Sequence, residues 1–202
     1  MNRNEIPAYA QELAALAKEM GAVHAVPFVL DDIAFDERTI MKCMFGCADR
    51  GKGLTCPSRP GFPSMEQWQR MLNKYKWGII VHAASKPVSQ KISLKLESKA
   101  FHDGYYMAFS MSDCGLCKEC AGLSGCETCR HPEMARPAFH SVGIDVFKPC
   151  AIWAWALKRW KTAIPSRKTG IPAYGWNDTT DRKNQPVFFT GWFSFYRGTF
   201  GI

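Results

Sequence analysis

Apolar residues recur at three- and four-residue steps in three stretches of the chain, which is the spacing of amphipathic helices. These stretches are residues 5–20, a segment that begins at Ser64, and residues 88 to about 104. Gln67, three residues after Ser64, completes a capping box at the start of the second stretch. The pattern therefore predicts three helices, each with one buried face.

Short apolar runs predict strands at residues 22–30 and 77–84, which are rich in Val, Ile and Phe. Residues 105–111 fit either a strand or a continuation of the preceding helix. A strand-like aromatic run follows at residues 187–196. Two further helices are expected, a short one near residues 133–141 and another at residues 146–160.

The order of these elements predicts a mixed α/β fold, in which helices flank a small sheet. Residues 43–61 are dense in Gly and Pro and form one cysteine-rich loop, and residues 114–129 form a second. Each loop follows a helix or strand, so the two could face one another. We expect a cysteine-rich domain over residues 1–160 and a basic aromatic extension over residues 161–202, packed on it or on a partner.

Composition sets limits on the class of protein. A chain of 202 residues with 47% hydrophobic residues buries roughly 70% of its unfolded surface, so a metal is not needed merely to fold it. No apolar run approaches the roughly 20 residues of a membrane span, and the N-terminus lacks the apolar segment of a signal peptide. We therefore expect the reducing cytoplasm, where disulfides rarely persist.

The net charge of +8 is concentrated near the C-terminus. Residues 151–202 hold eight Lys or Arg against two Asp, together with nearly half of the aromatic residues. Such a segment suits an acidic protein partner, nucleic acid, or packing with a solvated rim.

The second loop carries five of the nine cysteines, in the pattern C-x2-C-x2-C-x5-C-x2-C. A C-x2-C-x2-C run with a further cysteine is typical of iron–sulfur clusters. Zinc is the alternative, held by two C-x2-C pairs, although the spacer here is short and the first cysteine would be unused. The five residues are Cys114, Cys117, Cys120, Cys126 and Cys129.

The first loop has Cys43, Cys47 and Cys56, the last followed by Pro. Three thiolates leave one iron of a four-iron cluster without a local ligand. Either Cys126 or Cys150 supplies the fourth thiolate from elsewhere in the fold, or that iron is open to a small ligand and acts as a Lewis acid. Nine thiols cover the eight of two [4Fe-4S] clusters with one to spare.

Cationic residues surround the second loop. Arg130 and Arg136 are candidates for binding the cofactor, because nearby cations raise the reduction potential of an anionic cluster. Arg136 could instead pair with Glu133 on a helical turn. His131 is either a ligand or a hydrogen-bonding cap. His24 and His82 lie in strand-like runs and are expected to be core or surface residues.

The chain resembles a cysteine-rich family of predicted metal-binding proteins of unknown function, common in anaerobic bacteria and archaea, over about residues 36–150. The resemblance implies iron–sulfur binding by Cys43, Cys47 and Cys56 and by Cys114, Cys117, Cys120 and Cys129. Cys126, Cys150 and the segment from Trp160 depart from the family pattern, and either cysteine is a candidate completing ligand. The segments that carry the resemblance are Cys43-Met-Phe-Gly-Cys47, Cys56-Pro57, Phe101-His-Asp-Gly-Tyr-Tyr-Met-Ala-Phe, Cys114-Gly-Leu-Cys117-Lys-Glu-Cys120, Cys129-Arg-His-Pro-Glu-Met-Ala-Arg-Pro and Gly143-Ile-Asp-Val.

Three functions fit this pattern. The first is an electron carrier with two [4Fe-4S] clusters, whose row of lysines (Lys91, Lys95, Lys99) and basic tail dock an acidic ferredoxin or flavodoxin, or a larger redox enzyme. The second is a redox enzyme or maturation factor with an open iron on the first loop and the tail as a lid. Its proton-donor candidates are Asp103, Tyr105, Tyr106 and His131.

The third function is a zinc-stabilised module that binds nucleic acid, which the cysteine pattern favours less than the other two. It would use basic and aromatic residues of the tail. The aromatic tail could also bury itself in a second copy of the chain, forming a homodimer. The tail residues concerned are Arg159, Lys161, Arg167, Lys168, Trp176 and Trp192.

Overall fold

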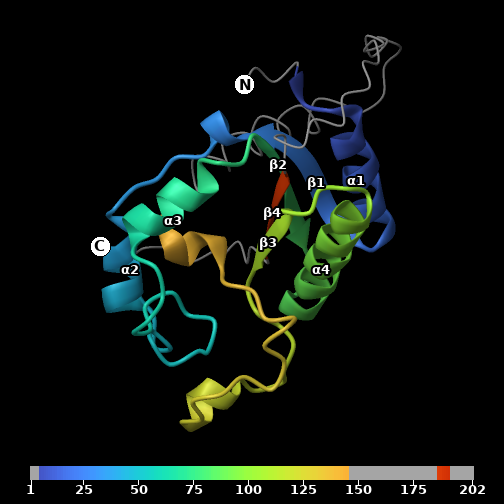
Figure 1. Ribbon diagram of the computed structural model, residues 1–202. Coiled ribbons are helices and arrows are strands. Elements are labelled where there is room, and N and C mark those ends of the chain that lie inside the picture. Colours follow the sequence, from blue (N-terminus) through green and yellow to red (C-terminus); the bar gives the residue numbers. More distant parts are fainter. Residues whose placement is uncertain (1–4, 146–185, 192–202) are drawn as a thin grey trace, which may run out of the picture.

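The computed structural model describes residues 5–145 and 186–191 (Figure 1). Their fold is a mixed α/β arrangement, as the sequence predicted. In chain order the elements are α1 (Ala8–Glu19), β1 (Ala22–Val29), η2 (Leu30–Asp32), α2 (Thr39–Gly46), α3 (Met65–Leu72), β2 (Trp77–Ala83), α4 (Lys86–His102), β3 (Phe109–Ser112), η3 (Ala121–Ser124), η4 (Phe139–Val142) and β4 (Pro186–Gly191).

The four strands form one sheet in the order β1-β2-β4-β3. β1 is antiparallel to β2, whereas β4 is parallel to both β2 and β3. Because β4 lies within residues 161–202, part of the C-terminal extension is a central strand of the sheet. Pro27 lies on β1 at the edge, where a residue without an N–H is tolerated.

One face of the sheet is covered by α1 and α4 (Figure 1). β2 sends alternate side chains to this face, as a strand with a two-residue repeat must. α1 and α4 contribute the apolar positions that recur along each helix. The buried residues are Ala10, Leu13, Ala14, Ala17, Ala25, Trp77, Ile79, Val81, Ala83, Ile92, Leu96, Ala100 and Phe188.

The opposite face packs against α3 and η4. The capping box predicted at the start of α3 is confirmed. The Gln67 N–H donates to Ser64 Oγ at 3.3 Å, and the Ser64 N–H donates to Gln67 Oε1 at 2.7 Å. The buried residues of this second core are Phe28, Ile33, Trp68, Leu72, Ile80, Met111, Phe139, Val142 and Ile144.

Three local expectations need correction or completion. The loop predicted from residue 43 begins later, because α2 continues to Gly46 and carries Cys43. Residues 105–111 do not extend α4, because the chain turns after His102 and then enters β3. Residues 133–141 form a turn and the start of η4 instead of an α-helix, since Pro137 disfavours helical geometry at the residue before it.

The predicted helix at residues 146–160 lies outside the described residues, as do Cys150 and most of the C-terminal extension. Among the residues that the structure describes, no helix has the length and apolar character needed to cross a membrane.

A pair of histidines joins β1 to β2 on adjacent strands. His24 and His82 are register partners, and their Nδ1 atoms lie 3.2 Å apart. Only one of two facing nitrogens can carry the proton of this hydrogen bond, so protonation of both rings removes it. Burial, and then the charge of Lys18, lower the pKa of His24.

We expect the pair to make folding pH-dependent. A histidine whose pKa is lower in the folded chain stabilises it above the ordinary histidine pKa of about 6.5, and this contribution is lost as the pH falls through the folded value. Urea unfolding at pH 7.5 and 5.5 should therefore show a smaller acid-induced loss for His24→Gln than for the wild type. His102→Gln, at an exposed position on α4, should behave like the wild type. Equal losses in all three proteins would contradict this.

Candidate metal centres

Cys43, Cys47 and Cys56, the first cysteine group, lie on α2 and the loop after it. Cys43 is on the last turns of α2, Cys47 directly follows the helix, and Cys56 lies further along the loop. Burial raises the pKa of the Cys43 thiol, and the negative charges of Cys47 and Cys56 raise it further, against the opposing charge of Arg50. The three thiols are therefore close enough to interact.

The second cysteine group is Cys114, Cys117, Cys120 and Cys129. Burial raises the pKa of the Cys114 thiol, although the Leu116 N–H lowers it, and the charges of the other three thiols raise it further. All four side chains are half-buried. The four thiols thus lie close enough to interact, and none of them comes from the first loop.

Backbone N–H groups act on several sulfurs of the second group. The His131 N–H donates to Cys129 Sγ at 3.4 Å. The N–H groups of Leu116 and Gly122 lower the pKa values of the Cys114 and Cys120 thiols, respectively. Such hydrogen bonds stabilise thiolates and adjust the potential of a metal held by them.

Cys120 shows the strongest effect of these donors. Partial burial raises the pKa of its thiol, but N–H groups of Leu54, Gly122 and Leu123, together with the charge of Arg130, outweigh burial and leave the pKa lowered. The donor at Leu54 belongs to the first loop, so the two cysteine loops meet. Arg130, predicted to act on the cofactor, is thereby placed beside the second group.

Cys126 is not among the thiols that raise the pKa of Cys114. Its thiol is exposed, and its N–H donates to the Ala121 carbonyl at 3.0 Å. Among the described residues, the thiols that act on Cys43 are those of Cys47 and Cys56. The ligand role predicted for Cys126 therefore stays a prediction.

The thiols gather without forming a finished mononuclear site. Within residues 5–145 and 186–191, no three Cys, His, Asp or Glu side chains are already arranged to hold one metal ion. The donor set itself fits a thiophilic metal, since soft thiolates supply every side chain of both groups.

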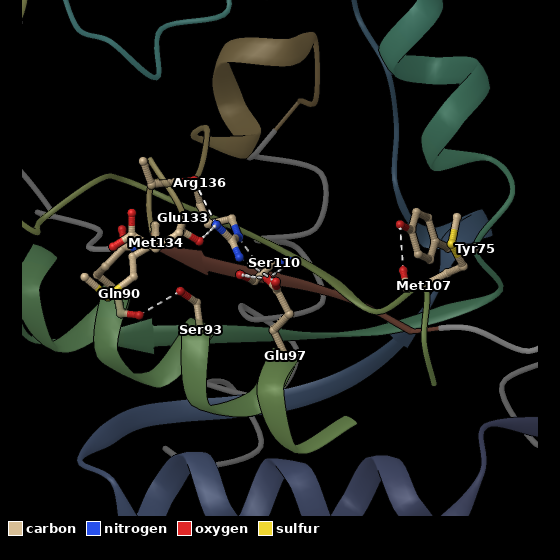
Figure 2. Close-up of polar contacts among 10 residues, drawn as sticks. Tyr75, Gln90, Ser93, Glu97, Met107, Ser110, Glu133, Met134 and Arg136 are labelled. Carbon is tan, nitrogen blue, oxygen red and sulfur yellow. Dashed lines mark hydrogen bonds and ion pairs between the residues drawn. The ribbon is translucent and has the colours of Figure 1, made fainter. Parts of the chain in front are cut away.

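The second loop is attached to α4 at its start and again at Met134, a few residues beyond Cys129. At the start, a Cβ on Gly115 would lie 2.5 Å from the Lys86 carbonyl carbon, so only glycine fits against the N-terminus of α4. At the second point, Gln90 Nε2 donates to the Met134 carbonyl at 2.9 Å, as Figure 2 shows. α4 therefore sets the position of the second group.

Arg136 completes this attachment by pairing with Glu97 of α4. Its Nη2 lies 2.6 Å from Glu97 Oε1 and its Nε 2.9 Å from Glu97 Oε2 (Figure 2). Its Nη1 donates to the carbonyls of Glu133 and Ala135. The pairing with the Glu133 carboxylate, expected as the alternative, is replaced by a bond to the Glu133 backbone. The predicted effect of Arg136 on a cofactor stays untested.

A hollow of about 700 Å³ lies beside one thiol of the second group. It is lined by two cationic side chains, a carboxylate, a histidine, a thiol and an apolar residue. His131, predicted as a ligand or cap, contributes its side chain to this wall and its N–H to Cys129. The lining residues are Leu116, Cys117, Lys118, Glu119, Arg130 and His131.

The other proton-donor candidates lie elsewhere. Asp103, Tyr105 and Tyr106 follow the C-terminus of α4, whereas Gly115 packs at its N-terminus. The 17 residues of α4 span about 25 Å, so these three side chains are not brought to the start of the second loop. Asp103 instead accepts hydrogen bonds from Tyr9 and, at 2.7 Å, from Lys99.

Sequence reasoning did not single out the residues that position the site. Gly122 stands among the cysteines, and a glycine there is a signal for close backbone approach. Glu97 carries no such signal, because its partner Arg136 is far away in the sequence.

A model of the family described as "Predicted metal-binding protein (DUF2284)" matches residues 27–165. No curated protein and no solved structure matches the chain.

Proposed function

The chain belongs to this family of predicted metal-binding proteins, and from that premise we propose that it holds two iron–sulfur clusters and passes electrons to or from a partner redox enzyme. The observation that carries the proposal is the gathering of Cys114, Cys117, Cys120 and Cys129, with the His131 N–H donating to Cys129 Sγ at 3.4 Å. The C-x2-C-x2-C run supports a cluster over a single zinc ion.

The second group supplies enough thiolates to hold a [4Fe-4S] cluster by itself. The first group supplies three. When bound, such clusters take up and release single electrons at potentials set by charge and hydrogen bonding. In this chain the N–H donors to the sulfurs and the cation of Arg130 favour the more reduced, more negative state of the second centre.

The hollow beside Cys117 is where we place the partner. Lys118 and Arg130 on its rim would attract an acidic surface of the ferredoxin or flavodoxin type. Lys91 and Lys95 are exposed on α4, the helix to which the second loop is fastened, and extend the positive charge. Attraction of this kind raises the association rate and weakens with salt.

A second function is favoured by the three-thiol composition of the first group. The described thiols acting on Cys43 are only those of Cys47 and Cys56. A cluster there would leave one iron open to a small substrate, as in a redox enzyme or maturation factor. Cys150, outside the described residues, is the thiol that would close this position.

Metal analysis of protein purified without oxygen tests the proposal. We expect a brown protein with about eight iron and eight sulfide ions per chain. Fewer than about five irons would reject two four-iron clusters. A colourless protein with stoichiometric zinc would reject iron–sulfur chemistry and leave the zinc-stabilised module.

A further inference from the structure

A short segment of the first loop, residues 51–56, touches both cysteine groups. At one end, the Gly51 N–H donates to Cys56 Sγ at 3.3 Å, and the Cys56 N–H donates to the Gly53 carbonyl at 3.0 Å. A thiol of the first group is thus built into the turn that shapes the segment. Any change in the position of Cys56 must move this turn.

The middle of the same segment packs tightly against the second loop. A Cβ on Gly122 would lie 2.3 Å from the Lys52 carbonyl oxygen and 2.8 Å from Leu54 Cγ. Real Cβ atoms do not approach backbone oxygen so closely, so only glycine permits this contact. Gly122 itself follows Cys120 by two residues, and its N–H contributes to the lowered pKa of that thiol.

The Leu54 N–H, from the first loop, faces the same contact and contributes to the lowered pKa of the Cys120 thiol. The Arg59 side chain also holds the segment, by donating from Nη1 to the Lys52 carbonyl at 3.1 Å. Backbone packing therefore links the turn that contains Cys56 to the loop that contains Cys120.

We propose that residues 51–56 couple the two cysteine groups, so that metal binding by the first group strengthens metal binding by the second. The segment is rich in glycine, and such backbone loses much conformational freedom when it is fixed. Metal binding at Cys56 fixes the turn and holds Lys52 and Leu54 against Gly122, two residues from Cys120. The second group then binds at a smaller entropic cost, and the effect is reciprocal. This inference rests on the proposed function only in requiring both groups to bind metal.

The test titrates the reduced, metal-free full chain with Co²⁺ without oxygen. Thiolate-to-cobalt absorbance follows binding, and cobalt held by four thiolates is distinguished from cobalt held by three. In an otherwise unaltered chain, Cys47→Ser should weaken the binding of Co²⁺ to the second group by about tenfold. Cys47 is an exposed thiol of the first group outside the segment, so this variant leaves residues 51–56 unaltered.

Two variants break the contact from opposite sides. Gly122→Ala places a Cβ against Lys52 and Leu54, and Leu54→Pro removes the N–H donor. In either background Cys47→Ser should have no further effect on the second group, which is the non-additivity expected of a broken coupling. Gly115→Ala is the matched control, because it crowds the second loop against Lys86, away from the first loop. There the tenfold effect of Cys47→Ser should persist.

Unchanged second-group affinity in Cys47→Ser, or a full effect that persists in Gly122→Ala and Leu54→Pro, would overturn the coupling. The comparison of Cys47→Ser with the wild type does not depend on whether Gly122→Ala or Leu54→Pro folds. Because Co²⁺ reports thiolate binding regardless of the native metal, the result is separate from the iron and sulfide analysis. Coupled cobalt binding in a protein without iron would reject the proposed function alone.

Discussion

Cys114→Ala is expected to lose about four iron and four sulfide ions per chain, whereas Cys126→Ala keeps the full complement. Cys114 is a half-buried thiol of the second group, and the charges of Cys117, Cys120 and Cys129 act on it. Cys126 lies in the same loop but its thiol is exposed. Alanine cannot act as a ligand, so loss of iron measures the part each thiol takes in binding.

The comparison uses iron and sulfide analysis after reconstitution without oxygen, with circular dichroism to establish that both variants fold. Cys126→Ala is the matched control, since it removes the same atom from the same loop. If Cys126→Ala loses iron as Cys114→Ala does, Cys126 is a ligand and the group of four is wrongly assigned. If neither variant loses iron, the second group does not hold a cluster.

The helices and strands with strong periodicity were predictable because their signals are local. The capping box of Ser64 and Gln67 lies within four residues, and the continuous apolar run of β2 follows from burial on both faces of the sheet. α2 was missed because the glycines after Gly46 dominate the surrounding composition, although Met and Lys within it are good helix formers.

The sheet order was not predictable in the same way. β4 lies between β2 and β3, although residues 113–185 separate it from β3 in the sequence. Periodicity identifies a strand but does not say which partners it pairs with, because pairing depends on contacts between distant residues.

The arrangement of the cysteines was likewise predictable only where the signal is local in the sequence. Spacing alone placed Cys114, Cys117 and Cys120 together, because two-residue gaps bring thiols into one space. The exposure of Cys126 and the contact between Gly122 and the first loop depend on how separate loops pack. The order of elements suggested that the two loops meet. Their contact requires glycine at position 122, and the residues that it meets in the first loop are far away in the sequence.

Glu97→Gln is expected to lower the free energy of unfolding by about 3 kcal/mol, because it leaves the Arg136 guanidinium partly buried without its counter-charge. Both side chains are largely buried, with 18% of Glu97 and 15% of Arg136 exposed. Glu97 Oε2 also accepts a hydrogen bond from the Ser110 N–H at 2.8 Å. The carboxylate therefore ties α4 to β3 and to the end of the second loop.

Urea unfolding of the reduced, metal-free chain measures this loss, which corresponds to a melting temperature lower by roughly 6 to 12 °C. The matched control is Lys99→Gln on the same helix, which breaks an ion pair with Asp103 whose side chains are both 37% exposed. Lys99→Gln should lower the free energy of unfolding by less than about 1 kcal/mol, since exposed ion pairs are screened by water. Arg136→Lys keeps the charge but loses the two-pronged contact, and should fall between the two. Equal effects of Glu97→Gln and Lys99→Gln would mean that the Glu97–Arg136 pair does not hold the second loop to α4.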